Sequence, residues 1–182
     1  MSDGDGDGNG NDDEGAPTNV PDRFDRLPAT AARRRVEGRP TRRAVLEFFE
    51  ENYGIAPATF EDHTFRERGA GKIWVFSGTA PDPCGIEGLG LVALRARREH
   101  WKPTLEAAQR FGEAATHNVI GLDPGDARAF LAGENREVAW DGDWGYLLVG
   151  HNLAGAPAVV GVGLYLRGEL RSQVPKGRRE EL

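Results

Sequence analysis

The sequence predicts an α+β fold in which a small N-terminal α/β unit is followed by a mixed β-barrel. Residues 41–115 alternate helical and strand-like hydrophobic patterns, and residues 116–182 hold many short strand-like segments around one helix. Residues 1–40 show neither pattern. We therefore divide the chain into a disordered acidic tail with a basic linker over 1–40, an α/β domain over 41–115 and a barrel over 116–182.

The N-terminal tail carries the whole charge excess of the chain. The 182 residues have a formal net charge of −6, and the first 16 hold six acidic and no basic side chains. Removing these six from the 29 acidic residues leaves 23, which equals the number of basic residues. Residues 1–19 are mostly Gly, Asp and Asn, which bury too little apolar surface to offset the entropy of ordering, so we expect disorder.

A basic cluster follows in "ARRRVEGRP", formed by Arg33, Arg34, Arg35 and Arg39. We interpret it as a linker whose charge balances the tail, and contact with nucleic acid is the alternative. In the whole chain, three basic residues are lysine and the other 20 of the 23 are arginine. Together with abundant Asp and Glu, this bias predicts a salt-adapted, GC-rich source such as a halophilic archaeon.

The α/β unit begins with a helix. In "TRRAVLEFFEENYGI" the apolar residues recur at helical spacing and Gly54 ends the pattern. "TFEDHTFRERGAGKIWVFSG" predicts two strands around the turn at 69–71, and "GIEGLGLVALRARREHW" predicts a third. "KPTLEAAQRFGEAAT" predicts a second helix, with Pro103 in its first turn.

The last third predicts the barrel. "HNVIGL" reads as a strand, and "DPGDARAFLAG" as a short helix with Asp123 as its cap, Pro124 at its first position and Gly133 at its stop. Further strands are predicted around "REVAW", "GYLLVGH", "AVVGVGLYL" and "ELRSQV". Gly161 and Gly163 share one face of their strand, which indicates close approach of another backbone, a ligand or a barrel bend.

Several signals for metal or catalytic chemistry are weak. "DGDGDGNGNDDE" matches the calcium-loop pattern, but flanking helices are missing and Gly10 takes the place of the apolar residue. The four histidines, at positions 63, 100, 117 and 151, have no metal-ligand spacing. Cys84 in "APDPCGIEG" imitates the motif of RNA cytosine-5 methyltransferases poorly and has no basic neighbours, so we interpret it as a loop cysteine. We expect no cofactor, no metal and no catalysis.

The C-terminal half resembles a PUA domain, the small RNA-binding barrel of pseudouridine synthases, archaeosine transglycosylases, ribosome-biogenesis factors and some RNA cytosine-5 methyltransferases. The likeness covers about residues 100–182 and rests on "KPTLEAAQRFGEAATHNVIGLDPGDARAFLAGE", "GYLLVGH" and "VVGVGLYLRGELRSQVPKGRR". Gly161, Gly163, Pro175, Lys176 and Arg179 fit the family's glycine strand and basic end. Residues 41–100 resemble the pre-PUA domain paired with such barrels. The chain departs from the methyltransferases in lacking their catalytic domain.

The resemblance implies RNA binding, and the residues support it. Arginine pairs phosphate bidentately and stacks on unpaired bases. We predict one contact surface along the final strand and "PKGRR", and a second near the domain junction. The first comprises Arg167, Arg171, Gln173, Lys176, Arg178 and Arg179, and the second comprises Arg95, Arg97, Arg98 and Lys102. The alternative is that the terminal bases only solubilise the chain end and pair with nearby glutamates.

These observations predict a non-catalytic protein that binds structured rRNA or tRNA in ribosome biogenesis or RNA modification. Its expected partners include RNA and a separate RNA-modifying enzyme or ribosome-assembly factor. A protein–protein adaptor is the main alternative, and a methyltransferase remnant that uses Cys84 is a third. No stretch approaches the ~18 apolar residues of a membrane helix, and the N-terminus lacks signal-peptide features, so we expect a cytoplasmic protein.

Overall fold

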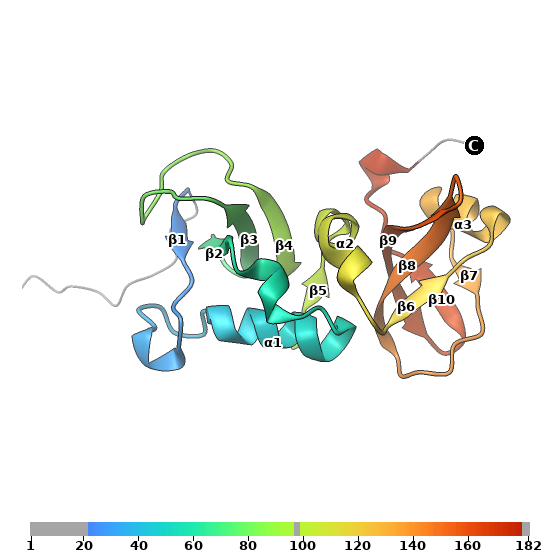
Figure 1. Cartoon of the computed structure of the whole chain (residues 1–182), viewed down its shortest axis with the longest axis horizontal. Helices are drawn as coiled ribbons and strands as arrows, with labels where there is room; N and C mark the ends of the chain where they lie inside the picture. The colour runs from blue at the N-terminus through green and yellow to red at the C-terminus, as the bar shows by residue number, and fades with distance from the viewer. Residues whose placement is uncertain (1–21, 97–98, 180–182) are drawn as a thin grey trace, which may run out of the picture.

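The computed structural model describes residues 22–96 and 99–179. It contains two five-stranded sheets, with helix α2 (Leu105–Phe111) lying between them (Figure 1). Helices and strands are mixed, as the α+β prediction expects. The predicted disorder over residues 1–19 falls outside the described residues. No helix in the described part of the chain has the length and apolar character that crossing a membrane requires.

The first sheet is antiparallel throughout and has the strand order β1-β2-β3-β4-β5. Its strands are β1 (Phe24–Arg26), β2 (His63–Arg68), β3 (Lys72–Ser77), β4 (Leu91–Arg95) and β5 (Lys102–Pro103). The predicted turn at 69–71 joins β2 to β3, so this pair of strands is confirmed.

Helix α1 (Arg42–Tyr53) confirms the first predicted helix. The Thr41 hydroxyl accepts a hydrogen bond from the backbone N–H of Ala44 at 3.0 Å, which satisfies one of the free donors at the helix start. Gly54 ends the helix with φ 65°, a conformation that glycine adopts without steric cost. The buried face of α1 consists of Val45, Phe49 and Tyr53.

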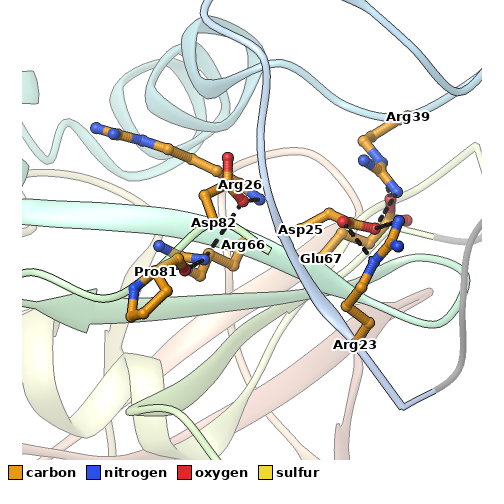
Figure 2. Close-up of polar contacts among 8 residues, drawn as sticks. All are labelled: Arg23, Asp25, Arg26, Arg39, Arg66, Glu67, Pro81 and Asp82. Carbon is orange, nitrogen blue, oxygen red and sulfur yellow. Dashed lines mark hydrogen bonds and ion pairs between the residues drawn. The ribbon is translucent and has the colours of Figure 1, made fainter. Parts of the chain in front are cut away.

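The linker predicted before α1 differs from the structure. Strand β1 pairs with β2, and Phe24 is completely buried. Arg39 is 6% exposed and donates to Glu67 at 2.8 Å and to Asp25 at 3.1 Å (Figure 2). The charge of Arg39 is therefore balanced by two carboxylates of the first sheet, on β1 and β2. The other members of the basic cluster, residues 33–35, are exposed as expected.

Arg66 fastens the loop that precedes Cys84 to the first sheet. Its guanidinium donates to the carbonyl oxygen of Pro81 at 2.8 Å (Figure 2). It also donates to the carbonyl oxygen of Ala80 at 2.8 Å. Asp82 in the same loop accepts from the backbone N–H of Arg26 at 2.9 Å. Cys84 exchanges two backbone hydrogen bonds with Phe24 and is buried, so this loop cysteine is part of the packing.

Helix α2 is confirmed, but its start differs from the prediction. Its cap is Thr104, whose hydroxyl accepts from the N–H of Ala107 at 3.2 Å. Pro103 lies one residue before the cap and pairs with Leu94 in the sheet. This edge strand tolerates proline because only two residues pair there. The helix buries Ala107, Ala108 and Phe111 in a core that both sheets share.

The second sheet has the strand order β6-β8-β9-β10-β7 and is curled into a half-barrel (Figure 1). The parallel pairing of β6 with β8 makes it mixed, since its other pairs are antiparallel. The strands are β6 (Val119–Gly121), β7 (Arg136–Glu137), β8 (Gly145–Leu153), β9 (Ala156–Leu166) and β10 (Glu169–Ser172). The change from one sheet to the other falls between α2 and β6.

Helix α3 (Pro124–Leu131) begins and ends as its predicted cap, first-turn proline and glycine stop indicate. Asp123 accepts from the N–H of Asp126 at 2.9 Å, Pro124 occupies the first turn, and Gly133 has φ 93° just after the helix. The helix packs Phe130, fully buried, against strand β9.

The two glycines of β9 make room for the α3 core. A Cβ at Gly161 would lie 2.6 Å from Cε1 of Phe130, and one at Gly163 would lie 2.5 Å from Cδ1 of Leu170. The closest neighbours of both glycines are therefore side chains, and not another backbone. The other face of β9 reaches the shared core through Val162.

Candidate nucleic-acid interface

The predicted contact residues fall in three places. Arg97 and Arg98 lie outside the described residues. Arg95 is on β4 and Lys102 is on β5, the edge strand of the first sheet, and the remaining cations are on or beside β10. The two predicted surfaces meet where β5 approaches the end of β10, because the Lys102 ammonium donates to the side-chain carbonyl of Gln173 at 2.5 Å.

A row of basic residues crosses the first sheet at this junction. Lys72 on β3 pairs in register with Arg95 on β4, and Arg95 pairs with Lys102 on β5. Directly opposite residues in an antiparallel sheet project from the same face, so these three cations form one row, which we call the basic row. In the described part of the chain, none of the three forms an ion pair with a carboxylate.

The electrostatics of the basic row follow from this arrangement. Burial lowers the pKa of Lys102, and the neighbouring charge of Arg95 lowers it further. Like charges directly opposite each other cost stability in a sheet. The Lys102 ammonium also lies 5.8 Å from the centroid of the Tyr146 ring, whose face attracts cations. The basic row thus presents unneutralised charge that an anion would relieve.

Lys72 is absent from the predicted contact residues. Its place in the row depends on the pairing register of β3 with β4, which has no local sequence signal. Lys72 follows the glycine-rich turn at 69–71, and it is exposed.

Two of the arginines near the chain end have carboxylate partners. Arg171 pairs with Glu169 at 2.6 Å, and Arg178 pairs with Glu106 of α2 at 2.9 Å. The hydrogen bond from Arg171 lowers the pKa of Glu169, and Asn135 contributes to the same shift. Such exposed pairs are worth about 0–1 kcal/mol each, so phosphate can compete for these arginines at little cost.

The other predicted residues near the chain end have different roles. Arg179 donates from Nε to the carbonyl of Val174 at 3.3 Å and packs against Gly133. Lys176 is exposed in the 3-10 turn at Lys176–Arg178. Arg167 has φ 53° in the turn from β9 to β10, about 20 Å of strand away from Gln173. The structure therefore brings Lys176 and Arg178 to the end of β10 near Gln173, and leaves Arg167 at the other end.

The histidines and Cys84 do not gather into a site. Within the described residues, no three His, Cys, Asp or Glu side chains are placed to hold a metal ion. His63 packs its ring edge-on against Phe111, with ring centroids 5.4 Å apart. His151 bonds the carbonyl of Leu122 at 3.0 Å, and His117 bonds the carbonyl of Glu51 at the same distance.

Comparison with known proteins covers the first half of the chain. A family model described as a family of unknown function, DUF7122, matches residues 10–90. The match includes β1, α1, β2, β3 and the ion pairs of Arg39, and it ends before β4 and the second sheet. No curated protein matches the chain.

Proposed function

We propose that this protein binds structured rRNA or tRNA and has no catalytic activity of its own. The observation that supports this most directly is the basic row: three cations in register across β3, β4 and β5 with no carboxylate partner among the described residues. Phosphate is the common anion of RNA, and lysine and arginine neutralise it with release of counterions. The row adjoins the end of β10 through the hydrogen bond from Lys102 to Gln173.

The resemblance of residues 100–182 to a PUA domain supports the same proposal. The curled shape of the second sheet supports a PUA-like barrel. On this proposal, the first sheet, most of which precedes the second sheet in the chain, is the pre-PUA-like unit. On this proposal, the protein acts in ribosome biogenesis or RNA modification beside a separate enzyme or assembly factor. The RNA contacts the row through its phosphates and extends over the exposed residues Lys176 and Arg178.

RNA crosslinking in cells tests the proposal. The main variant carries Lys72→Gln, Arg95→Gln and Lys102→Gln. The matched control carries glutamine at residues 33–35, which are three exposed arginines that do not belong to the row, so both variants lose the same charge. We expect the main variant to recover much less RNA than the control. With purified protein and the recovered RNA, the slope of log affinity against log salt should fall by about 2 to 3 in the main variant.

The result that would overturn this assignment is equal recovery and an equal salt slope for the two variants. Thermal unfolding of both proteins shows whether the comparison concerns folded molecules. A third variant, Arg171→Gln with Lys176→Gln, tests the end of β10 and should weaken binding less, because Arg171 already has a carboxylate partner.

A protein–protein adaptor is the second candidate function. The ion pairs of Arg171 and Arg178 favour it, since arginines neutralised within the chain add little to an anion-binding surface. Affinity capture from the source cells separates the two functions. A protein partner that survives nuclease treatment, together with no crosslinked RNA, would support the adaptor and contradict RNA binding.

A further inference from the structure

A cleft of about 710 Å³ lies between α1 and the segments that lead into β5 and β8. Its volume falls in the range of roughly 300–1,000 Å³ that is usual for ligand sites. Three stretches of chain form it: the outer face of α1, residues 99–101 and residues 143–146. The predicted RNA contacts do not line it, so the cleft is a separate feature.

Aromatic rings form much of the cleft. Phe48 of α1 and Trp101 pack with their ring centroids 5.6 Å apart, and Tyr146 also lines the cleft. Trp144 is 56% exposed, and it and Ile86 are the two large hydrophobic residues that are exposed in the described part of the chain. His100 supports the Trp144 ring edge-on at 4.8 Å between centroids.

The charged residues that line the cleft are all acidic. They are Glu47, Glu51, Glu99 and Asp143, and no lysine or arginine lines it. Glu47 pairs with Arg43 at 3.5 Å, in a contact where both side chains are well exposed. In residues 22–96 and 99–179, the other three carboxylates form no ion pair. Carboxylates without cations repel phosphate, so this surface is unfavourable for the RNA backbone.

A cation already occupies the border of this aromatic surface. The ammonium of Lys102 lies 5.8 Å from the centroid of the Tyr146 ring, and Tyr146 also lines the cleft. Aromatic faces and carboxylates together are the usual surroundings of a bound ammonium or guanidinium group. We propose that the cleft binds an arginine- or lysine-rich segment of a partner protein.

A peptide fits this cleft better than a small cation does. The cleft is open to solvent and larger than one side chain, so it suits a ligand that stays attached to a larger body. Guanidinium groups would stack on Trp144 while their N–H groups donate to Glu51 and Glu99. The charge of the cleft and the chemistry of the segment are complementary, which favours fast and selective association.

This proposal does not depend on the proposed RNA binding. It rests on the acidic and aromatic lining, whereas RNA binding rests on the basic row. The cleft and the row share a border at Tyr146 and Lys102, so variants for the test are chosen away from that border.

The test uses a short synthetic peptide that alternates arginine with serine. The control peptide replaces each arginine by citrulline, which keeps the shape and removes the charge. Binding to the full chain is measured by calorimetry at low salt. We expect the arginine peptide to bind and the citrulline peptide to bind at least tenfold more weakly.

Two variants locate the binding site. Trp144→Ala should weaken the arginine peptide about two- to fivefold, which is the worth of a cation–π contact at an exposed site. Glu51→Gln with Glu99→Gln should weaken it further and reduce its salt dependence. The matched controls are Ile86→Ala, which removes the other exposed hydrophobic side chain, and Glu61→Gln with Glu137→Gln, which removes two exposed carboxylates outside the cleft. Both controls should bind like the unaltered protein.

Four results would overturn the proposal. One is equal binding of the two peptides, and another is unchanged binding in both cleft variants. The third is binding of oligouridylate that Trp144→Ala weakens, since the cleft would then stack bases instead of cations. Self-association that Trp144→Ala abolishes would also contradict a separate partner, because a second copy of this chain would be the occupant. If the basic-row variant loses RNA binding but still binds the arginine peptide, the two ligands use different surfaces and both proposals are supported independently.

Discussion

The exchange of Gly161 for alanine tests whether the glycines of β9 serve the core or a ligand. The added methyl carbon would lie 2.6 Å from Cε1 of the Phe130 ring. Carbon atoms in contact normally stay about 3.5–4.0 Å apart, so the ring or the strand must move by about 1 Å. Phe130 is fully buried, and its carbonyl accepts a hydrogen bond from the Ser172 hydroxyl at 2.8 Å, which ties the end of α3 to β10.

We expect Gly161→Ala to lower the free energy of unfolding by about 1–3 kcal/mol, which is the usual cost of adding a methyl group to a packed core. The measurement is urea unfolding followed by circular dichroism. The matched control is Gly121→Ala in β6, where no atom lies within 4 Å of the added Cβ. The control should unfold within about 0.5 kcal/mol of the unaltered protein, as exposed substitutions usually do.

A double variant identifies the clash itself. Phe130→Leu shortens the side chain opposite Gly161, so the pair of substitutions should cost less than the sum of the two single costs. Contacting residues usually differ from additivity by about 0.5–3 kcal/mol. Unchanged stability of Gly161→Ala, combined with loss of RNA binding, would refute the packing explanation, because the glycine would then be needed for a ligand.

Three further predictions concern buried or half-buried groups of the first sheet and α1. Arg39→Met should lower the free energy of unfolding by about 3–5 kcal/mol in a urea titration, because it leaves the buried carboxylate of Glu67 unpaired. Burial, with help from Arg110, lowers the pKa of His63, so stability should be full above about pH 6.5 and fall as the pH drops below it. His63→Gln should lose that part of the pH dependence. Burial raises the pKa of Tyr53, so stability should fall as the pH rises above about 10. The tyrosinate absorbance of Tyr53, measured as the difference from a Tyr53→Phe variant, should appear only together with unfolding.

The helices and most strands were predictable because their signals are local. Asp123, Pro124 and Gly133 lie within eleven residues and specify α3 through its cap, first turn and stop. The alternating segments of β9 and β10 meet at Arg167 and Gly168, and both residues have the positive φ of a two-residue hairpin turn. Signals of this kind act within one turn or one hairpin, so the sequence alone indicates them.

The features that sequence analysis missed depend on distant partners. Arg39 lies in an arginine-rich stretch with no regular pattern, and its burial follows from carboxylates 14 and 28 residues away. Strand β1 has only three residues, which is too short for an alternating pattern to be recognised. Lys72 joins the basic row only through strand register. The ion pair between Arg178, which follows β10, and Glu106 of α2 joins residues far apart in the sequence, so it has no local signal.

Acidic and basic side chains are separated on the surface of this protein, and the net charge does not show this. Residues 17–182 hold equal numbers of acidic and basic side chains, yet the structure keeps some of them apart. The basic row contains three cations without a carboxylate partner, and the cleft contains three carboxylates without a cation partner, all among the described residues. Exchanging cations of the basic row with carboxylates of the cleft would reduce the repulsion between like charges at both surfaces, and such repulsion costs stability. We therefore expect the two surfaces to act on ligands of opposite charge, and a basic partner protein seated in the cleft would place its own cations beside RNA held on the row.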